Sequence, residues 1–222
     1  MKTVAIVPGY NPGHKARDVL EKIKRYVTAI VYIDDGSTDN SLKLVKQVPG
    51  IRVLTHSENK GKGWALKTGI DYVLRNKPAD FAVFIDSDGQ HNPADIMKLQ
   101  KAQGKSDADI IIGGRMSDRR DMPALRQFSN KLSSSLISLA ARQRISDSQS
   151  GFRLVRREVL EEIPWHPGRY EAETDFIIRA ARQKFRIVTT KIETIYSDDI
   201  KSYYNNFKDT LRIAGVIAKR IW

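Results

Sequence analysis

Short, almost entirely apolar runs alternate along the first half of the chain with segments whose apolar residues recur at helical spacing. The runs end at residues that break regular structure, such as Pro8-Gly9 and Asp34-Asp35-Gly36, and therefore predict β-strands. The predicted strands are residues 3–7, 29–33, 51–54, 81–85 and 109–112. Helices are predicted at 19–27, 42–48 and 65–73, and after Asn92-Pro93, with the Asn as N-cap and the Pro in the first turn.

Strands that are apolar on both faces indicate a parallel sheet covered by helices on both sides, because only such strands keep both faces out of water. We therefore predict an α/β fold, Rossmann-like, with a mostly parallel central sheet and a single domain. In open sheets of this type, ligands bind beyond the carboxyl ends of the strands. Polar clusters follow three of the predicted strands, at residues 8–11, 34–39 and 86–91. The functional site should lie where these clusters meet.

The second half of the chain is less regular. Its predicted elements are a polar, basic helical stretch at 122–144, helices near 157–163 and 173–183, and a strand at 186–192. The pattern divides the chain into one domain at 1–200, with halves 1–115 and 116–200, and a basic amphipathic helix at 201–222. That helix either packs on the domain or contacts a membrane surface.

Composition narrows the classes of protein. With 222 residues, 41% hydrophobic and 29% charged, the chain fits one globular α/β domain. The absence of cysteine excludes disulfides, thiolate metal sites and cysteine nucleophiles. A net charge of +12 predicts an anionic partner. Since no apolar run is long enough to span a bilayer and no signal peptide is recognisable, we expect a cytoplasmic protein, with peripheral contact at the inner face of the membrane as the alternative.

Asp86-Ser87-Asp88 places two carboxylates two residues apart where a predicted strand ends, and Gly89-Gln90 follows. Mg²⁺ and Mn²⁺ take oxygen ligands and keep positions open for water and substrate phosphates, so two or three protein oxygens are enough to hold them. Turns after strands also contain Asp for conformational reasons alone. The motif by itself therefore does not establish a metal site.

Further motifs accompany this one along the chain. They are Pro8-x-Tyr10-Asn11, Asp34-Asp35-Gly36-Ser37-Thr38-Asp39, Asn59-Lys60-Gly61-Lys62-Gly63, Ile112-Gly113-Gly114-Arg115, Ser150-Gly151-Phe152-Arg153 and Tyr170-Glu171-Ala172-Glu173-Thr174. In order and spacing the set resembles the family-two glycosyltransferases of the A-type fold, in particular the polyprenyl-phosphate (dolichyl-phosphate mannosyltransferase-like) branch. The resemblance covers nearly the whole chain. It implies a hexosyltransferase with a GDP- or UDP-linked sugar as donor.

The resemblance assigns the donor to the half at 1–115. The residues that it implies for nucleotide-sugar binding are Pro8, Tyr10, Asn11, Asp34, Asp35, Lys60, Lys62, Asp86 and Ser87. One carboxylate of Asp34-Asp35 would accept a hydrogen bond from a base N–H, and the lysines and glycines at 60–63 suit a diphosphate at a helix N-terminus. Asp86, Asp88 and Gln90 would hold Mg²⁺ or Mn²⁺. Pro12 replaces an acidic residue common in the family, which leaves guanine and uracil both open.

The family is inverting, which implies single displacement, with a carboxylate taking the proton of an attacking hydroxyl. Glu171 is the first candidate for that base and Glu173 the second. Arg115 would meet a phosphate of donor or acceptor. A polyprenyl phosphate acceptor is mostly dianionic near pH 7 and would hardly need a base. It would instead need cations, for which the candidates are Arg115, Arg126, Lys131 and Lys201; a glycan hydroxyl is the alternative acceptor.

Two related classes compete with a glycosyltransferase. A sugar-nucleotide pyrophosphorylase should carry a Gly-rich, Arg-containing loop after its first strand, and Pro8-Gly9-Tyr10-Asn11 is not such a loop. A catalytically inactive nucleotide-sugar-binding protein stays open, although the retention of Asp86, Asp88 and Glu171 counts against it. Nucleic acid is not an expected partner, because acidic strand ends repel phosphate and no nucleic-acid motif is present.

Overall fold

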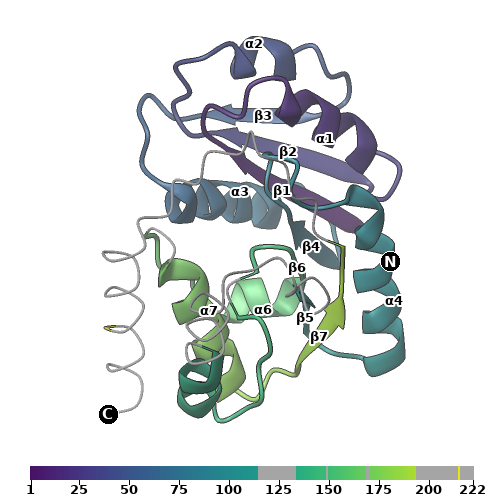
Figure 1. Cartoon of the computed structure of the whole chain (residues 1–222), viewed down its shortest axis with the longest axis vertical. Coiled ribbons are helices and arrows are strands. Elements are labelled where there is room, and N and C mark those ends of the chain that lie inside the picture. Colours follow the sequence, from purple (N-terminus) through teal and green to yellow (C-terminus); the bar gives the residue numbers. More distant parts are fainter. Residues whose placement is uncertain (115–133, 149, 169–170, 194–214, 216–222) are drawn as a thin grey trace.

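The computed structural model contains a seven-stranded sheet between two layers of helices (Figure 1). The strand order is β3-β2-β1-β4-β6-β5-β7, and every pairing is parallel except those of β6 with β4 and β5. The structure describes residues 1–114, 134–148, 150–168, 171–193 and 215. The prediction of a mostly parallel sheet with helices on both faces is confirmed.

The helices and strands follow the predicted alternation with small shifts at their ends. The strands are β1 (Thr3–Gly9), β2 (Ala29–Asp34), β3 (Arg52–Thr55), β4 (Phe81–Phe84), β5 (Ile110–Gly114), β6 (Arg153–Arg156) and β7 (Ile187–Lys191). The helices are α1 (Lys15–Ile23), α2 (Ser41–Val45), α3 (Lys62–Asn76), the 3-10 turn η1 (Pro93–Asp95), α4 (Ile96–Ser106), α6 (Arg157–Glu162) and α7 (Glu171–Arg182). Residues 134–141 are also helical. Asn92 caps η1 as predicted, its side chain accepting from the Ala94 N–H at 3.1 Å.

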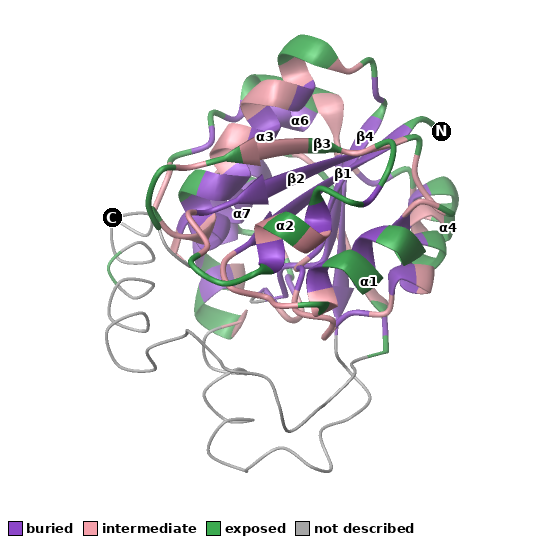
Figure 2. Cartoon of the chain, turned by 90° about the horizontal axis from the view of Figure 1, so that it is seen from above, coloured by how far each residue is buried: buried purple, intermediate pink, exposed green. Residues whose placement is uncertain are grey.

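Alternate residues of β1 face two separate hydrophobic cores. Val4 and Ile6 pack in the core formed with α3, α6 and α7, whereas Ala5 and Val7 pack in the core formed with α1, α2 and α4. Figure 2 shows the result: the central strands are buried, and exposed residues lie on the outer faces of the helices. Burial on both faces is the physical reason that these strands read as continuous apolar runs.

The antiparallel strand β6 was not predicted. Its sequence, Arg-Leu-Val-Arg, is short and charged at both ends, so it shows neither a continuous apolar run nor a clear alternation. It pairs with β4 on one side and β5 on the other, and its first residue, Arg153, is fully buried. Its direction brings the segment before Arg153 to the edge of the sheet where β4 and β5 end.

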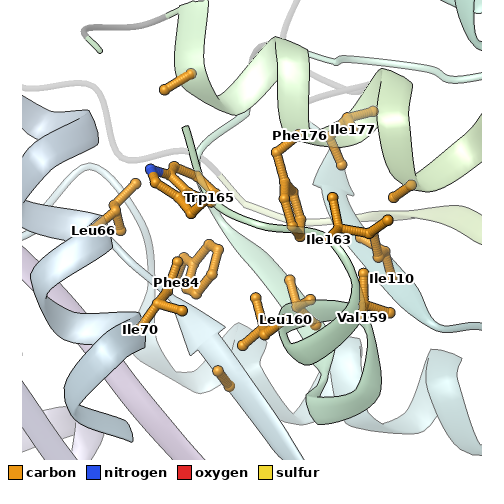
Figure 3. Packing of buried hydrophobic residues seen from close by; sticks show 14 of the residues in the cluster. Leu66, Ile70, Phe84, Ile110, Val159, Leu160, Ile163, Trp165, Phe176 and Ile177 are labelled. Carbon is orange, nitrogen blue, oxygen red and sulfur yellow. The ribbon is translucent and has the colours of Figure 1, made fainter. Parts of the chain in front are cut away.

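Trp165 ties the start of α3 to the segment that leads into α7. Figure 3 shows its ring between Leu66 of α3 and Phe176 of α7, with Phe84 of β4 beside it. The ring centroids of Trp165 and Phe176 are 5.1 Å apart, and those of Trp165 and Phe84 are 5.9 Å apart. The indole N–H donates to the carbonyl oxygen of Gly63 at 2.9 Å. The position of the α3 N-terminus therefore depends on the loop before α7.

No helix in the described part of the chain is long and apolar enough to cross a bilayer. The helix predicted at 201–222 lies outside the described residues except for Gly215, as does the part of the predicted 122–144 stretch before residue 134. The domain limits at 115 and 200 stay predictions.

Candidate active site

The carboxyl ends of β1, β2 and β4 meet at one edge of the sheet. Gly9 at the end of β1 pairs with Asp34 at the end of β2, and Ile6 pairs with Phe84 at the end of β4. The strand order reverses at β1, since β2 and β3 continue on one side and β4 on the other. The predicted polar clusters therefore meet at the topological switch point, where sheets of this type bind ligands.

A cluster of charged side chains joins the start of α3, the end of β4 and the start of α7. The Nζ atom of Lys62 lies 2.7 Å from Oδ1 and 3.0 Å from Oδ2 of Asp86, and 3.5 Å from Oε2 of Glu173. Gly151 leaves the space for this cluster, because a Cβ atom there would lie 2.6 Å from Nζ of Lys62. Burial acts to raise the pKa of Asp86, but nearby positive charge, first that of Lys62, outweighs it and holds the pKa below its ordinary value.

Asp88 is the carboxyl of the D-x-D motif whose ionised form is disfavoured. Its burial, followed by the negative charge of Asp86, raises its pKa to about 6. Its Oδ1 atom accepts a hydrogen bond from the Gln90 N–H at 2.9 Å. A cation between Asp86 and Asp88 would relieve this repulsion.

A divalent cation fits this donor set. The described residues contain no cluster of three His, Cys, Asp or Glu side chains that could hold a metal. The protein could therefore offer Asp86, Asp88 and the amide oxygen of Gln90, with the remaining ligands from water and substrate. Mg²⁺ and Mn²⁺ commonly bind in this way to sites that also hold phosphates.

Asp34 is buried at the base of the loop that follows β2, with 1% of its surface exposed. Its Oδ2 atom accepts from the Ser37 N–H at 3.2 Å, whereas Oδ1 is buried without a hydrogen-bond partner among the described residues. Asn11 closes the same loop from the other side, its Oδ1 accepting from the N–H groups of Thr38 at 2.8 Å and Asp39 at 3.2 Å. Asp34 thus keeps one oxygen available, while the Asn11 carbonyl is occupied.

Asp35 has a different environment from its neighbour. Its Oδ1 lies 2.7 Å from Nδ1 of His56 and accepts from the Lys60 N–H at 3.1 Å, and its Oδ2 accepts from the Gly61 N–H at 2.8 Å. The Nε2 atom of His56 lies 2.9 Å from the Thr68 hydroxyl on α3. Both carboxylate oxygens of Asp35 are therefore engaged within the protein, where they shape the loop that starts α3.

The remaining predicted donor residues lie around these two loops. Ser87 is buried and its hydroxyl donates to the Pro8 carbonyl at 2.9 Å, which ties the end of β4 to the end of β1. Tyr10 is half-buried just beyond β1, and the side chain of Lys60 is exposed beside α3. Arg115 lies outside the described residues, as do the other proposed acceptor cations, Arg126, Lys131 and Lys201.

The two candidate bases both lie in the first turn of α7. Glu173 is 5% exposed, contacts Lys62 and has a buried Oε1 without a hydrogen-bond partner in the described part of the chain. Glu171 faces Gly168, where a Cβ would lie 3.0 Å from its Oε1, and its Oε2 is buried without such a partner in the same part of the chain. The geometry brings the second candidate, Glu173, to the cluster with Asp86.

Arg153 organises this region, a role that the sequence did not reveal. Its guanidinium donates to three backbone carbonyls, those of Ser150 at 2.8 Å, Ser148 at 2.8 Å and Glu173 at 3.2 Å. Burial acts to lower the pKa of this guanidinium, and the nearby carboxylates, first that of Glu173, oppose the shift without cancelling it. The sequence signal for this role was the arginine in the motif Ser150-Gly151-Phe152-Arg153. Its partners are backbone carbonyls, which are brought near by the fold and carry no residue-type signature.

Comparisons with known proteins show the family and the fold of the chain. An uncharacterized protein of Methanocaldococcus jannaschii is 30% identical over 99% of both chains. The UDP-N-acetylglucosamine–dolichyl-phosphate N-acetylglucosaminyltransferase of Methanococcus voltae is 28% identical over 87% of this chain and 85% of its own. Glucosyl-3-phosphoglycerate synthase from Mycobacterium tuberculosis, solved with Mn²⁺, uridine diphosphate and phosphoglyceric acid, has a TM-score of 0.73 at 20% identity, covering 99% of this chain and 78% of that one. This last likeness shows a shared fold.

The fold is that of the A-type glycosyltransferase architecture. The model of glycosyl transferase family 2 matches residues 4–164, and the chain belongs to this family. It is a glycosyltransferase, similar to the polyprenyl-phosphate sugar transferase branch.

Proposed function

We propose that the protein transfers a sugar, with inversion, from a nucleotide diphosphate sugar to a polyprenyl phosphate, in a reaction that depends on Mg²⁺ or Mn²⁺. The observation that carries this proposal is the placement of Asp86 and Asp88 just after β4, with Asp86 in contact with Lys62 at the start of α3. Carboxylates for a metal and a helix N-terminus for phosphate thus converge on one point of the sheet edge.

The donor would lie across the ends of β1, β2 and β4. The unpartnered Oδ1 of Asp34 would accept from a base N–H, with Pro8 and Tyr10 beside the base and ribose. The diphosphate would lie at the start of α3, where the helix dipole favours an anion and Lys60 and Lys62 add positive charge. A bound Mg²⁺ or Mn²⁺ would stabilise the negative charge that grows on the departing diphosphate.

Glu173 is the residue that we place nearest the reacting sugar. Its carboxylate contacts Lys62, which also contacts Asp86, so it lies on the side of α7 that faces the proposed diphosphate. With a hydroxyl acceptor, Glu173 would take the proton, and Glu171 is the alternative base. With a phosphate acceptor no base is needed, and a buried anion at this point would instead balance Lys62 and Arg153.

The proposal of a polyprenyl phosphate acceptor rests on sequence similarity and on the net charge of the chain. The relative from Methanococcus voltae is named for a dolichyl-phosphate acceptor. The net charge of +12 suits an anionic acceptor at a membrane surface. Arg115, Arg126, Lys131 and Lys201 would then bind the acceptor phosphate, and the segment 201–222 would provide peripheral membrane contact.

The test is a transfer assay with radiolabelled UDP- and GDP-linked hexoses, Mn²⁺, and vesicles that carry dolichyl phosphate. We expect labelled glycolipid from wild type and at least about a hundredfold less from Asp88→Asn, as is typical when a group that stabilises transition-state charge is removed. Asp71→Asn is the matched control, because Asp71 is a carboxylate of α3 paired with Lys67 away from the site. Unchanged transfer by Asp88→Asn would contradict the proposed metal site, and transfer to a soluble glycan in place of the lipid would contradict the acceptor.

A further inference from the structure

Lys62 forms an ion pair with Asp86, a carboxylate that the proposed metal site requires. Its ammonium lies within 3.0 Å of both oxygens of Asp86, the first carboxylate of the D-x-D motif. The Lys62 side chain is 20% exposed, and Glu173 lies 3.5 Å away on its other side. Two anions from different elements thus hold one lysine ammonium at the centre of the site.

The position of this ammonium is set by the backbone as well as by its partners. Lys62 is the first residue of α3, and Asp35 fixes the preceding loop through the N–H groups of Lys60 and Gly61. Trp165 fixes the turn that follows through the Gly63 carbonyl. The backbone of Lys62 is therefore held in place, and a change of partner needs movement of its flexible side chain alone.

A divalent cation and this ammonium compete for the same carboxylate. Mg²⁺ or Mn²⁺ would take Asp86 oxygens as ligands, whereas Lys62 holds the same oxygens at 2.7 and 3.0 Å. Two positive ions that share one carboxylate repel each other strongly in a half-buried site. The ammonium must therefore move before Asp86 can bind a metal with full strength.

A diphosphate provides the ammonium with another partner. It would lie at the N-terminus of α3, within reach of the residue that begins the helix, and its negative charge would attract Lys62 away from Asp86. We propose that Lys62 is an internal counter-cation that weakens the binding of Mg²⁺ or Mn²⁺ alone and releases Asp86 when a nucleotide diphosphate arrives, so that metal and nucleotide bind cooperatively. This inference rests on the proposed function, because it takes its metal and diphosphate sites as given.

The experiment measures Mn²⁺ binding directly, through the loss of the electron paramagnetic resonance signal of free Mn²⁺ on titration with protein. Wild type should bind Mn²⁺ weakly alone and at least about tenfold more tightly with saturating UDP, a coupling in the usual range for linked sites. Lys62→Met should bind Mn²⁺ alone about tenfold more tightly than wild type, bind UDP more weakly, and lose most of the coupling.

Lys67→Met is the matched control, because Lys67 is a lysine of the same helix paired with Asp71. It should behave as wild type. If the thermal midpoint of Lys62→Met falls well below that of wild type, Lys62→Gln, which keeps a hydrogen-bond donor without the charge, carries the same expectation.

The outcomes separate this inference from the function beneath it. The counter-cation role alone is overturned if both Lys62 variants bind Mn²⁺ no more tightly than wild type while Mn²⁺ and UDP still bind together. Absence of any Mn²⁺ binding by wild type, with or without UDP, overturns the metal site and this inference with it.

Discussion

His56 and Asp35 form a contact that connects the residue after β3 to the residue after β2: Nδ1 of the imidazole lies 2.7 Å from Oδ1 of the carboxylate. His56 directly follows β3, and its Nε2 reaches Thr68 on α3. The same carboxylate accepts the N–H groups of Lys60 and Gly61. One buried side chain thus holds the loop that would receive the diphosphate.

We predict that Asp35→Ala loosens this loop. Three donors would lose their acceptor, and since each buried unsatisfied group costs about 1–3 kcal/mol, the free energy of unfolding should fall by about 3 kcal/mol. Urea unfolding measures this change, and UDP affinity should fall with it. Glu58→Ala, an exposed carboxylate of the same loop, should change stability by less than about 0.5 kcal/mol. Equal stability of the two variants would contradict the role given to Asp35.

Arg153→Gln should be among the most destabilising changes in the chain. It removes most of the donors that reach the carbonyls of Ser148, Ser150 and Glu173. We expect a loss of about 3–5 kcal/mol in the free energy of unfolding, measured by urea titration. Arg144→Gln replaces an exposed arginine that shortly precedes Arg153 in the chain, and it should leave the free energy of unfolding nearly unchanged. A loss below about 1 kcal/mol for Arg153→Gln would show that its three hydrogen bonds do not hold the loop.

Trp165→Phe tests the tie between α3 and the segment before α7. Phenylalanine keeps much of the ring packing against Phe84 and Phe176 but leaves the Gly63 carbonyl without the indole donor. The free energy of unfolding should fall by about 1–2 kcal/mol, a decrease of roughly 2–8 °C in thermal midpoint. Trp64→Phe is the natural comparison, since Trp64 is 44% exposed on α3 and should show little change. Equal shifts in both variants would count against the hydrogen bond.

Asp88→Asn should stabilise the metal-free protein at pH 7.5. Because the folded state raises the pKa of Asp88 from 3.8 to about 6, ionisation favours the unfolded chain. Stability is therefore lost as the pH rises from about 4 through 6, and the full penalty is present above that range. Asparagine removes the charge, so we expect a gain of about 1 kcal/mol after allowance for solvent screening, or about 2–4 °C.

This gain has a characteristic pH dependence, which differential scanning fluorimetry with a chelator can follow. It should shrink toward pH 4, where the carboxyl of the folded wild type is protonated and that of the unfolded chain, with its ordinary pKa of 3.8, is only partly ionised. A gain of the same size at pH 4 and pH 7.5 would show that the charge of Asp88 is not its cause.

The sequence predicted the sheet and the meeting of the polar strand ends because both depend on local patterns. Apolar runs end at Asp34 and Asp86, and the parallel arrangement places such ends together. The distinct roles of Asp34 and Asp35 could not be predicted in this way. Successive residues at a strand end point in opposite directions, and the partners of Asp35 lie 21 to 26 residues further along the chain.

The contributions of Arg153 and Trp165 were hidden for a related reason. Their hydrogen bonds go to backbone carbonyls, which carry no signature of residue type. Strand β6, which sets the position of Arg153, has too few residues to show a period. The register of β6 between β4 and β5 brings Arg153 to the site.

The antiparallel direction of β6 also determines which changes in chain length the fold can tolerate. Gly113 donates to the Phe152 carbonyl at 2.9 Å, so the chain leaves the sheet after β5 and returns to it at neighbouring points. The closure entropy of an excursion whose two ends are fixed side by side grows only slowly with its length. The connection between β5 and β6 could therefore change in length among relatives, apart from its buried residues such as Ile137 and Gly151, while the carboxylates that follow β4 stay where they are. This would let one donor site serve many acceptors.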